Sequence, residues 1–190
     1  MHCTVRKRLR LQGSEMTVSI RRATNSDIPV LRALVESAYR GDSARGGWTH
    51  EADLLDGQRT DIAMLAGVIE DPDQCILLAE DAGTMVGCVQ VSRKSADTSY
   101  LGLLTVDPSR QAGGLGRVLI SAAEEFAKKE FAARRMEMTV IRQRDELIEY
   151  YQRRGYATTG EERPFPMEDP RFGLPKTRSL AFVVMARKLD

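Results

Sequence analysis

The sequence predicts a fold of the α/β (α+β) class, in which helices flank a central sheet. Over residues 17–189 the periodic segments follow the order strand, two helices, three strands, helix, strand, helix, two strands. Strands are indicated by apolar residues at every second position, and helices by apolar residues three and four apart. The clearest patterns are a hairpin at residues 75–91 and a strand that runs through a glycine turn into a helix at residues 98–130. Together they predict one α/β domain.

The first part of the chain predicts a strand followed by two helices. Apolar alternation indicates the strand over residues 17–22, and Thr24 and Asp27 form a capping-box pair before the first helix. The expected core face of that helix consists of Ile28, Leu31, Leu34, Val35 and Ala38. The second helix is expected over residues 60–70, and Pro72 would end it. Its inward residues would be Ile62, Leu65 and Ile69.

The middle of the chain predicts an antiparallel meander. Residues 75–80 and 85–91 read as strands around the turn at residues 81–83, and the strand at residues 98–106 extends the pair. By contrast, residues 40–57 are rich in glycine and polar side chains, which indicates a loop.

The remaining segments alternate between helices and strands. The helix after the glycine turn has an apolar face formed by Leu115, Val118, Leu119, Ala122, Ala123 and Phe126. Beyond it the sequence predicts a strand at residues 136–141, a helix at 145–154 ending at Gly155, and closing strands at 157–160 and 180–186. The proline-rich residues 163–175 are expected to be irregular.

Composition excludes several classes of protein. Hydrophobic residues make up 42% of the 190 residues and charged residues 29%, and the formal net charge is +1. These values exclude a disordered, collagen-like or strongly nucleic-acid-binding chain. No apolar run approaches the length of a membrane span. With the near-neutral charge, this means that neither a nucleic acid nor a membrane is expected as a partner.

The three cysteines lack metal-ligand spacing, so no metal is expected. Cys75 and Cys88 stand in apolar strand-like surroundings, which suggests buried thiols in a reducing cytoplasm. The third cysteine, Cys3, lies in the basic N-terminal segment.

Residues 1–15 are basic and show no apolar periodicity. We expect a flexible N-terminal arm there, with the folded domain over residues 16–190. No long apolar core follows the basic run, as a secretory signal would require. The run leaves open a weak contact with nucleic acid or a membrane surface.

The segment that carries the chemistry joins the strand at residues 98–106 to the next helix, through Gly113, Gly114 and Gly116. The first N–H groups of a helix have no intrahelical partner and carry the positive end of its dipole, and glycines let a phosphate approach the backbone. A Walker loop would end in Gly-Lys-Ser/Thr, and a dinucleotide fingerprint would have a glycine where this chain has Leu119. The turn is therefore expected to bind the phosphates of another ligand.

The pattern Gln111-x-x-Gly114-x-Gly116 directly follows Leu104-x-Val106-x-Pro108. It resembles the acyl-CoA signature of the GNAT acetyltransferase superfamily, Q/R-x-x-G-x-G/A after an L-x-V-x-P strand end. The opening strand, the turn at Thr24 and the first helix are also similar to the start of that family. The order of elements matches its fold over nearly the whole chain.

The resemblance implies a GNAT fold: a mixed, mostly antiparallel sheet with a splayed parallel pair of strands, residues 98–106 and 136–141, flanked by helices. In that family the splay frees backbone groups to bind the pantetheine arm of acetyl-CoA as though it were a strand. The backbone of Leu104, Thr105 and Val106 would hold the pantetheine and the acetyl carbonyl. The pyrophosphate would be held by the N–H groups of Gln111, Ala112, Gly113, Gly114, Leu115, Gly116 and Arg117.

Residues 147–156 are similar to the family's LYxxxGF segment, whose tyrosine often protonates the departing thiolate. Aligning the glycine places that tyrosine at Tyr151, with core packing as the alternative role. Tyr150 points about 100° away on the helix and is expected to be structural or to face the substrate. Where the family often has asparagine, this chain has Arg144, which would meet a CoA phosphate or solvent.

No glutamate occupies the strand at residues 98–106, so a base must come from elsewhere. The candidates are His50, Glu51, Asp53 and Glu137, beside a relay through water. We assign the role to Glu51 among these side chains.

In this superfamily the segments before the second and the last strands usually form the acceptor wall. Here they contain the predicted acceptor-binding residues Trp48, Glu51, Asp53 and Phe172. An aromatic and acidic mixture suits a small cationic amine. If residues 51–53 are extended, Glu51 and Asp53 share a face.

The resulting hypothesis is an acetyl-CoA-dependent N-acetyltransferase that acts on the primary amine of a small molecule by direct attack in a ternary complex. One alternative is a non-catalytic acyl-CoA-binding or sensing module. Another is acetylation of a protein N-terminus or lysine, against which the long loops argue. The identity of the acceptor and the formation of a homodimer stay open.

Overall fold

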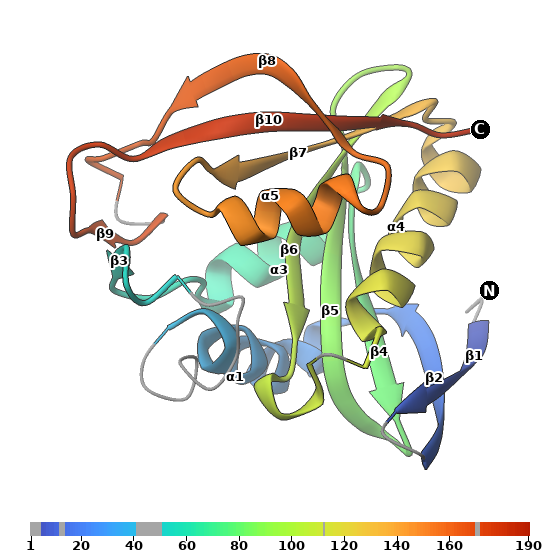
Figure 1. Cartoon of the computed structure of the whole chain (residues 1–190). Coiled ribbons are helices and arrows are strands. Elements are labelled where there is room, and N and C mark those ends of the chain that lie inside the picture. Colours follow the sequence, from blue (N-terminus) through green and yellow to red (C-terminus); the bar gives the residue numbers. More distant parts are fainter. Residues whose placement is uncertain (1–4, 12–13, 41–50, 112, 170–171) are drawn as a thin grey trace.

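The computed structural model describes residues 5–11, 14–40, 51–111, 113–169 and 172–190 (Figure 1). Within them, an eight-stranded sheet has the order β1-β2-β4-β5-β6-β7-β10-β8. Its strands are β1 (Val5–Leu11), β2 (Ser14–Arg22), β4 (Gln74–Asp81), β5 (Thr84–Arg93), β6 (Thr98–Val106), β7 (Arg135–Ile141), β8 (Ala157–Pro164) and β10 (Ala181–Lys188). A separate two-stranded pair joins β3 (Leu55–Asp56) to β9 (Leu174–Pro175).

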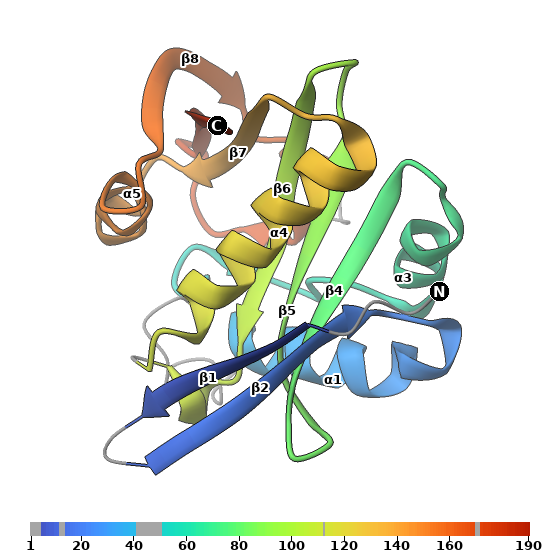
Figure 2. The same cartoon turned by 90° about the vertical axis from the view of Figure 1, so that its right-hand side faces the viewer.

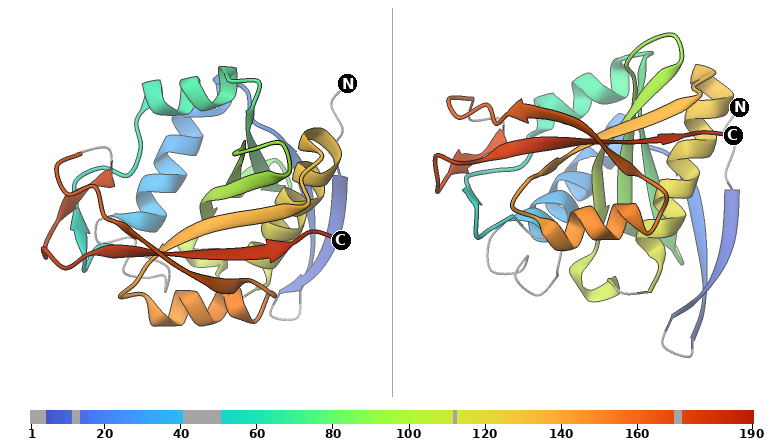
Figure 3. Two further views of the ribbon diagram at one scale, coloured as in Figure 1. Left: turned by 90° about the horizontal axis from the view of Figure 1, so that it is seen from above. Right: turned by 45° about the horizontal axis from the view of Figure 1, so that its top comes forward.

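Four α-helices accompany the described strands: α1 (Ile28–Tyr39), α3 (Ile62–Glu70), α4 (Leu115–Phe131) and α5 (Asp145–Gln152). The 3₁₀ turns η1 (Asn25–Asp27) and η2 (Pro108–Arg110) precede α1 and the glycine turn. Figure 2 shows α4 crossing one face of the sheet, and Figure 3 shows α1 and α3 on the opposite face. These elements confirm the α/β fold class, and the expected elements occur in the expected order, with β1, β3 and β9 as additional strands that were not predicted from the sequence.

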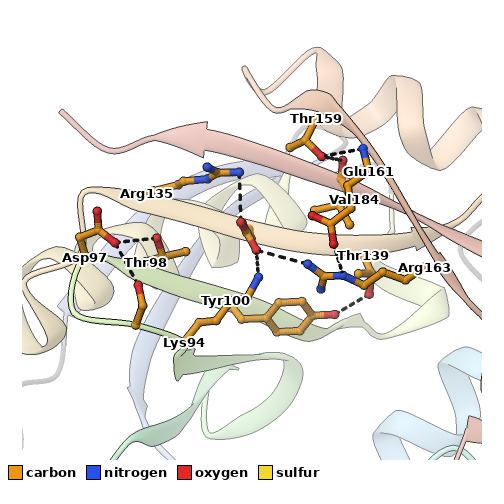
Figure 4. Close-up of polar contacts among 12 residues, drawn as sticks. Lys94, Asp97, Thr98, Tyr100, Arg135, Thr139, Thr159, Glu161, Arg163 and Val184 are labelled. Atoms are coloured by element: carbon orange, nitrogen blue, oxygen red, sulfur yellow. Dashed lines mark hydrogen bonds and ion pairs between the residues drawn. The ribbon is translucent and has the colours of Figure 1, made fainter.

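The sheet is antiparallel at every junction except the one between β6 and β7. Those two strands run parallel and pair only at Thr98↔Arg135, Ser99↔Met136 and Tyr100↔Glu137. Beyond these pairs they diverge, as Figure 1 shows. The splayed parallel pair is thereby confirmed. The hydroxyls of Tyr100 and Thr139 bond at 2.6 Å just past the last pair, which fixes the narrow end of the gap (Figure 4).

Two buried apolar clusters cover the two faces of the sheet. The larger cluster joins α4 to the sheet and includes Tyr151 of α5. The smaller joins α1 and α3 to the opposite face. Such burial, at about 25 cal/mol per Å² of apolar surface, is the main source of stability of the fold.

The first helix forms as expected, and its five predicted core residues are buried. Thr24 N–H donates to Asp27 Oδ2 at 2.8 Å, so the capping-box pair is present at the 3₁₀ turn that leads into α1. Arg21 on β2 also contacts Asp27 Oδ1 at 2.7 Å and Glu80 Oε1 at 2.6 Å. Hydrogen bonding to Arg21 is the main reason that the pKa of Asp27 falls from 3.8 to about 2.

The second helix differs from the expectation at its start. It begins at Ile62 after Asp61, whose Oδ1 accepts from the N–H of Met64 at 2.8 Å. Leu65 is buried as expected, but Ile62 is 60% exposed, so its predicted inward position is wrong. Ile62 lies in the first turn of α3, about 10 Å along the helix axis from Ile69. The inward-facing side of the helix is covered by the rest of the protein around Leu65 but not at this first turn.

The N-terminal segment also differs. A flexible arm was expected over residues 1–15, whereas Val5–Leu11 forms β1 and pairs along its length with β2. β2 itself begins at Ser14 rather than residue 17. Nearer the C-terminus, β8 continues to Pro164, and the irregular segment after it contains the two-residue strand β9.

Candidate functional site

A cavity of about 550 Å³ occupies the gap between the diverging strands. Residues 101–104 of β6 and 138–141 of β7 form its two sides. The glycine turn at the start of α4 closes one end of the cavity. The segment of α5 also lines the cavity, through Leu147, Tyr150, Tyr151 and Arg154. The other end is bounded by Tyr39, Glu51, Leu55, Arg59, Phe165, Phe172 and Phe182. The site is thus a channel with a polar glycine end and an aromatic end.

The glycine turn lies where the sequence placed it. Gly114 is the N-cap of α4 and has φ +82°, a conformation that other residues adopt only at a cost. Of the predicted pyrophosphate-binding residues, the cavity is lined by Gln111, Gly113, Gly114, Leu115, Gly116 and Arg117. Ala112 lies outside the described residues. The geometry therefore brings the first-turn N–H groups of a 17-residue helix to the end of the cavity.

The β6 side of the cavity is shaped by a bulge. The register with β5 shifts between Cys88 and Gln90, and Leu103 has φ +48°. Leu104 and Val106 line the cavity, as predicted for pantetheine-binding residues, whereas the Thr105 side chain is buried on the other side and donates to Leu103 O at 3.0 Å. Only the backbone of Thr105 could serve a ligand here.

Tyr39 contributes a contact that the sequence did not predict. Its hydroxyl donates to the Leu104 carbonyl at 2.7 Å and so links the end of α1 to the bulged strand. Burial raises the pKa of Tyr39 to about 12, which keeps the phenol neutral and able to donate. The Leu104 carbonyl, with two lone pairs, retains one further acceptor position.

Tyr151 and Tyr150 both line the cavity, which agrees with the substrate-facing alternative for Tyr150. The Tyr151 side chain is 6% exposed, and burial holds its pKa well above the ordinary value. Tyr150 lies against the glycine turn, since a Cβ on Gly116 would stand 2.5 Å from its hydroxyl oxygen. Arg154 covers the Tyr150 ring at 3.2 Å and donates to the Tyr150 carbonyl at 2.5 Å. Both phenols keep their protons at neutral pH.

Glu51 reaches the aromatic end of the cavity, but it is not free to act as an isolated negative charge. Its Oε2 accepts from Arg40 Nη1 at 2.7 Å, and the Arg40 side chain is 6% exposed. Arg40 Nη2 also donates to the Phe172 carbonyl at 3.4 Å. A buried arginine therefore ties Glu51 to the C-terminal segment that carries Phe172, another predicted acceptor residue that lines the cavity.

The predicted pairing of Glu51 with Asp53 is wrong. The N–H groups of Leu54 and Leu55 both donate to Glu51 O at 2.9 Å, so residues 51–55 form a turn rather than an extended segment. In a turn, residues two apart point in different directions. Asp53 is exposed and does not line the cavity. Trp48 and His50 lie outside the described residues.

Glu137 is kept away from the cavity. It lies on β7, 7% exposed, at the narrow end of the β6–β7 gap. Lys94 contacts its Oε2, Arg135 Nη2 its Oε1 at 3.0 Å, and Arg163 Nη2 its Oε2 at 4.0 Å. Figure 4 shows these three cations converging from different segments. Glu137 thus stabilises the junction of β6 and β7, and it does not face the site as the base hypothesis required.

Arginine dominates the charge of the cavity. Its described lining contains one carboxylate, Glu51, and the arginines Arg59, Arg110, Arg117, Arg144 and Arg154. Arg144, the residue that replaces the family's asparagine, is half-buried at the start of α5. This positive surplus suits an anionic ligand.

Within the part of the chain that the structure describes, no cluster of three or more His, Cys, Asp or Glu side chains is placed to hold a metal ion. None of the described helices has the length and apolar character needed to cross a bilayer.

Known proteins share this fold. The chain is similar to yncA from Salmonella typhimurium, solved with its cofactor acetyl-CoA (21% identity over 93% of this chain and 95% of that one, TM-score 0.67). It is also similar to Ard1 from Thermoplasma volcanium (18% identity, 91% and 98% covered, TM-score 0.67). A third similar structure is the spermidine/spermine N-acetyltransferase SpeG from Vibrio cholerae (14% identity, 90% and 92% covered, TM-score 0.64).

At such low sequence identities, the similarity to these solved structures establishes only the fold. Membership of a family has to be shown by the sequence itself. No curated protein matches the chain. Residues 32–156, which contain β6, the glycine turn, α4 and α5, match the Acetyltransferase (GNAT) family. This match covers more than half of the chain, and the chain therefore belongs to the GNAT acetyltransferase family.

Proposed function

We propose that this protein transfers the acetyl group of acetyl-CoA to a primary amine of a small molecule, by direct attack in a ternary complex. The observation that carries the proposal is the cavity between β6 and β7, which ends on the glycine turn at the N-terminus of α4. Such a channel accepts an extended ligand with phosphates at one end and a reactive group further along.

In this proposal the cofactor lies along β6. The turn from Gln111 to Arg117 holds the pyrophosphate through backbone N–H groups, and Arg110 and Arg154 add positive charge at that end. The pantetheine arm pairs with the backbone of Leu104, Thr105 and Val106, which has no strand partner on the β7 side. The thioester then lies near the middle of the cavity, beside Tyr151.

The chemical step forms one bond and breaks another. The neutral amine attacks the thioester carbonyl carbon, the C–S bond breaks, and the thiolate takes a proton from the Tyr151 hydroxyl. The ammonium form of the acceptor first loses a proton, directly or through water, to Glu51, the carboxylate of the described lining. The amine proton released after attack restores the tyrosine through solvent.

A small acceptor suits an aromatic end that is narrowed by a pair of strands. The β3–β9 pair joins residues 55–56 to residues 174–175 beside the cavity, and Lys176 Nζ contacts Asp56 Oδ1 at 3.0 Å. A protein substrate would need an open groove at this place. The known polyamine substrate named for SpeG supports a small-molecule acceptor. Buried free thiols at Cys75 and Cys88 support a reducing, cytoplasmic location.

The test is release of CoA from acetyl-CoA with a panel of primary amines, detected with a thiol reagent. Acetyl-CoA alone should raise the melting temperature, and at least one amine should accelerate thiol release. Thermal stabilisation without release by any amine would favour the non-catalytic acyl-CoA-binding module and contradict the proposal.

A further inference from the structure

Among the described residues, the acceptor end of the cavity carries more positive than negative charge. Glu51 is bonded to Arg40, a buried arginine that already uses this carboxylate as its partner. That pair contributes little net charge, and Arg59 lines the wall of the cavity near Tyr39. A diamine or polyamine would place a second cation beside this arginine, and like charges in a partly desolvated site repel.

The main chain at Arg59 is anchored by the Glu36 carboxylate. The Arg59 N–H donates to Glu36 Oε1 at 2.7 Å, and the N–H of Thr60 donates to the same oxygen at 2.8 Å. Its guanidinium lies over the Tyr39 ring, 5.1 Å from the ring centroid. Among the described residues, no carboxylate forms an ion pair with it. A half-buried cation on a cavity wall that has no ion-pair partner in the described part of the chain is a ready partner for an anionic ligand group.

Tyr39 relates this cation to the reacting centre. Its ring stacks under Arg59, and its hydroxyl bonds Leu104 O on the strand where the thioester is proposed to lie. The N–H of Glu51 donates to Tyr39 O at 3.1 Å, so Glu51 adjoins the same residue. Arg59, Glu51 and the proposed position of the thioester beside Leu104 therefore all adjoin Tyr39.

The other described residues at this end of the cavity are mostly apolar. The rings of Phe165 and Phe182 lie 5.1 Å apart, and Phe165 meets Phe172 edge-on at 6.3 Å. Leu55 and Ile141 complete the surface. Such a wall stabilises an apolar side chain and offers little to a polar one.

We infer that the acceptor is an amine that also carries a carboxylate and an apolar body, as in an apolar α-amino acid. Its carboxylate pairs with Arg59, its amine lies between Glu51 and the thioester, and its side chain packs on the phenylalanines. The inference rests on the proposed acetyltransferase function and adds the class of acceptor to it. It also replaces the small cationic amine expected from the sequence.

The test compares amines that differ only in the carboxylate. L-phenylalanine is paired with 2-phenylethylamine, and L-leucine with 3-methylbutylamine, with spermidine as a polycationic probe, all at saturating acetyl-CoA. We expect kcat/KM to be about 10- to 100-fold higher for the amino acid of each pair, because a charged hydrogen bond is worth about 1.5–3 kcal/mol. Arg59→Met should remove this preference, and Arg32→Met, at an exposed arginine of α1, should retain it.

Two outcomes would overturn the inference in different ways. Equal or higher kcat/KM for the decarboxylated amines or spermidine would refute the carboxylate-bearing acceptor and leave the acetyltransferase function standing. Thermal stabilisation by acetyl-CoA without turnover of any amine would refute the function itself, and the inference with it. If Arg59→Met fails to fold, the wild-type comparison of matched pairs decides the question alone.

Discussion

The contact between Gly116 and Tyr150 yields a double-mutant cycle. A Cβ on Gly116 would stand 2.5 Å from the Tyr150 hydroxyl oxygen but 3.6 Å from its Cζ and 3.9 Å from a Val106 methyl. The Tyr150 hydroxyl is therefore the one group that obstructs the methyl of Gly116→Ala. Tyr150 cannot easily turn aside, because Arg154 covers its ring and Tyr151 meets it edge-on at 5.3 Å. Overpacking of this kind costs about 1–3 kcal/mol.

The second half of the cycle removes the obstruction. In the Tyr150→Phe background, Gly116→Ala meets ordinary van der Waals contacts and gains about 0.5–1 kcal/mol from the better helix propensity of alanine. The propensity gain is the same in both backgrounds and cancels, so the interaction energy between the two substitutions should equal the overpacking cost, about 1–3 kcal/mol in favour of the double variant. Any other hydrogen bond of the Tyr150 hydroxyl is lost in both proteins that carry Tyr150→Phe, so its contribution cancels.

The assay is urea unfolding of the four proteins without ligand, followed by far-UV circular dichroism, with the free energy of unfolding taken from linear extrapolation. An interaction energy below about 0.5 kcal/mol, the level of ordinary additivity, would refute the close approach of α5 to the glycine turn. Acetyl-CoA should stabilise Gly116→Ala less than wild type, because the added methyl stands at the turn proposed to bind pyrophosphate.

Three further predictions follow from the site and the core. Tyr151→Phe should lower kcat by about 10²- to 10⁴-fold without weakening acetyl-CoA binding, as pre-steady-state thiol release would show; an unchanged chemical step would return Tyr151 to a packing role. Arg40→Met should reduce the free energy of unfolding by about 3 kcal/mol, because it leaves the partly buried Glu51 carboxylate without its cation, and Glu51→Gln in the same chain should recover part of the loss. The Asp27 pKa is lowered from 3.8 to about 2 in the fold, so its contribution to stability is present above pH 4 and is lost as the pH falls toward 2. Arg21→Met should flatten stability over that pH window, and an unchanged acid profile would contradict the assignment.

The strand, glycine turn and helix at residues 98–131 could be predicted because their signals are local. Periodicity sets the strand and the helix, and the glycines mark the turn between them. The same local reasoning could have found part of β1, where Arg6, Arg8 and Arg10 alternate with apolar residues on either side of Lys7. A charged segment with period 2 still forms a strand when a neighbour supplies the backbone partners, and β2 does so here.

The acceptor end could not be predicted in the same way, because its contacts join distant segments. Arg40 bonds Phe172 across 132 positions of sequence, and Tyr39 bonds Leu104 across 65. No pattern near Arg40 or Arg59 indicates that one arginine neutralises Glu51 while the other faces a cavity. Reading Glu51 and Asp53 as an acidic pair failed because residues 51–55 form a turn, and the sequence did not show that Arg40 pairs with Glu51.

The short β6–β7 junction also bears on aggregation. A strand edge with unpaired N–H and C=O groups is a template on which another polypeptide can add a strand. Here the divergence creates two such edges, but they face each other across a cavity that Tyr39, Tyr151 and Phe182 line. A peptide with side chains on both faces of its backbone would meet these rings, whereas a thin chain without branches would not. Interior strand edges can thus stay available to a slender ligand and be withheld from other proteins.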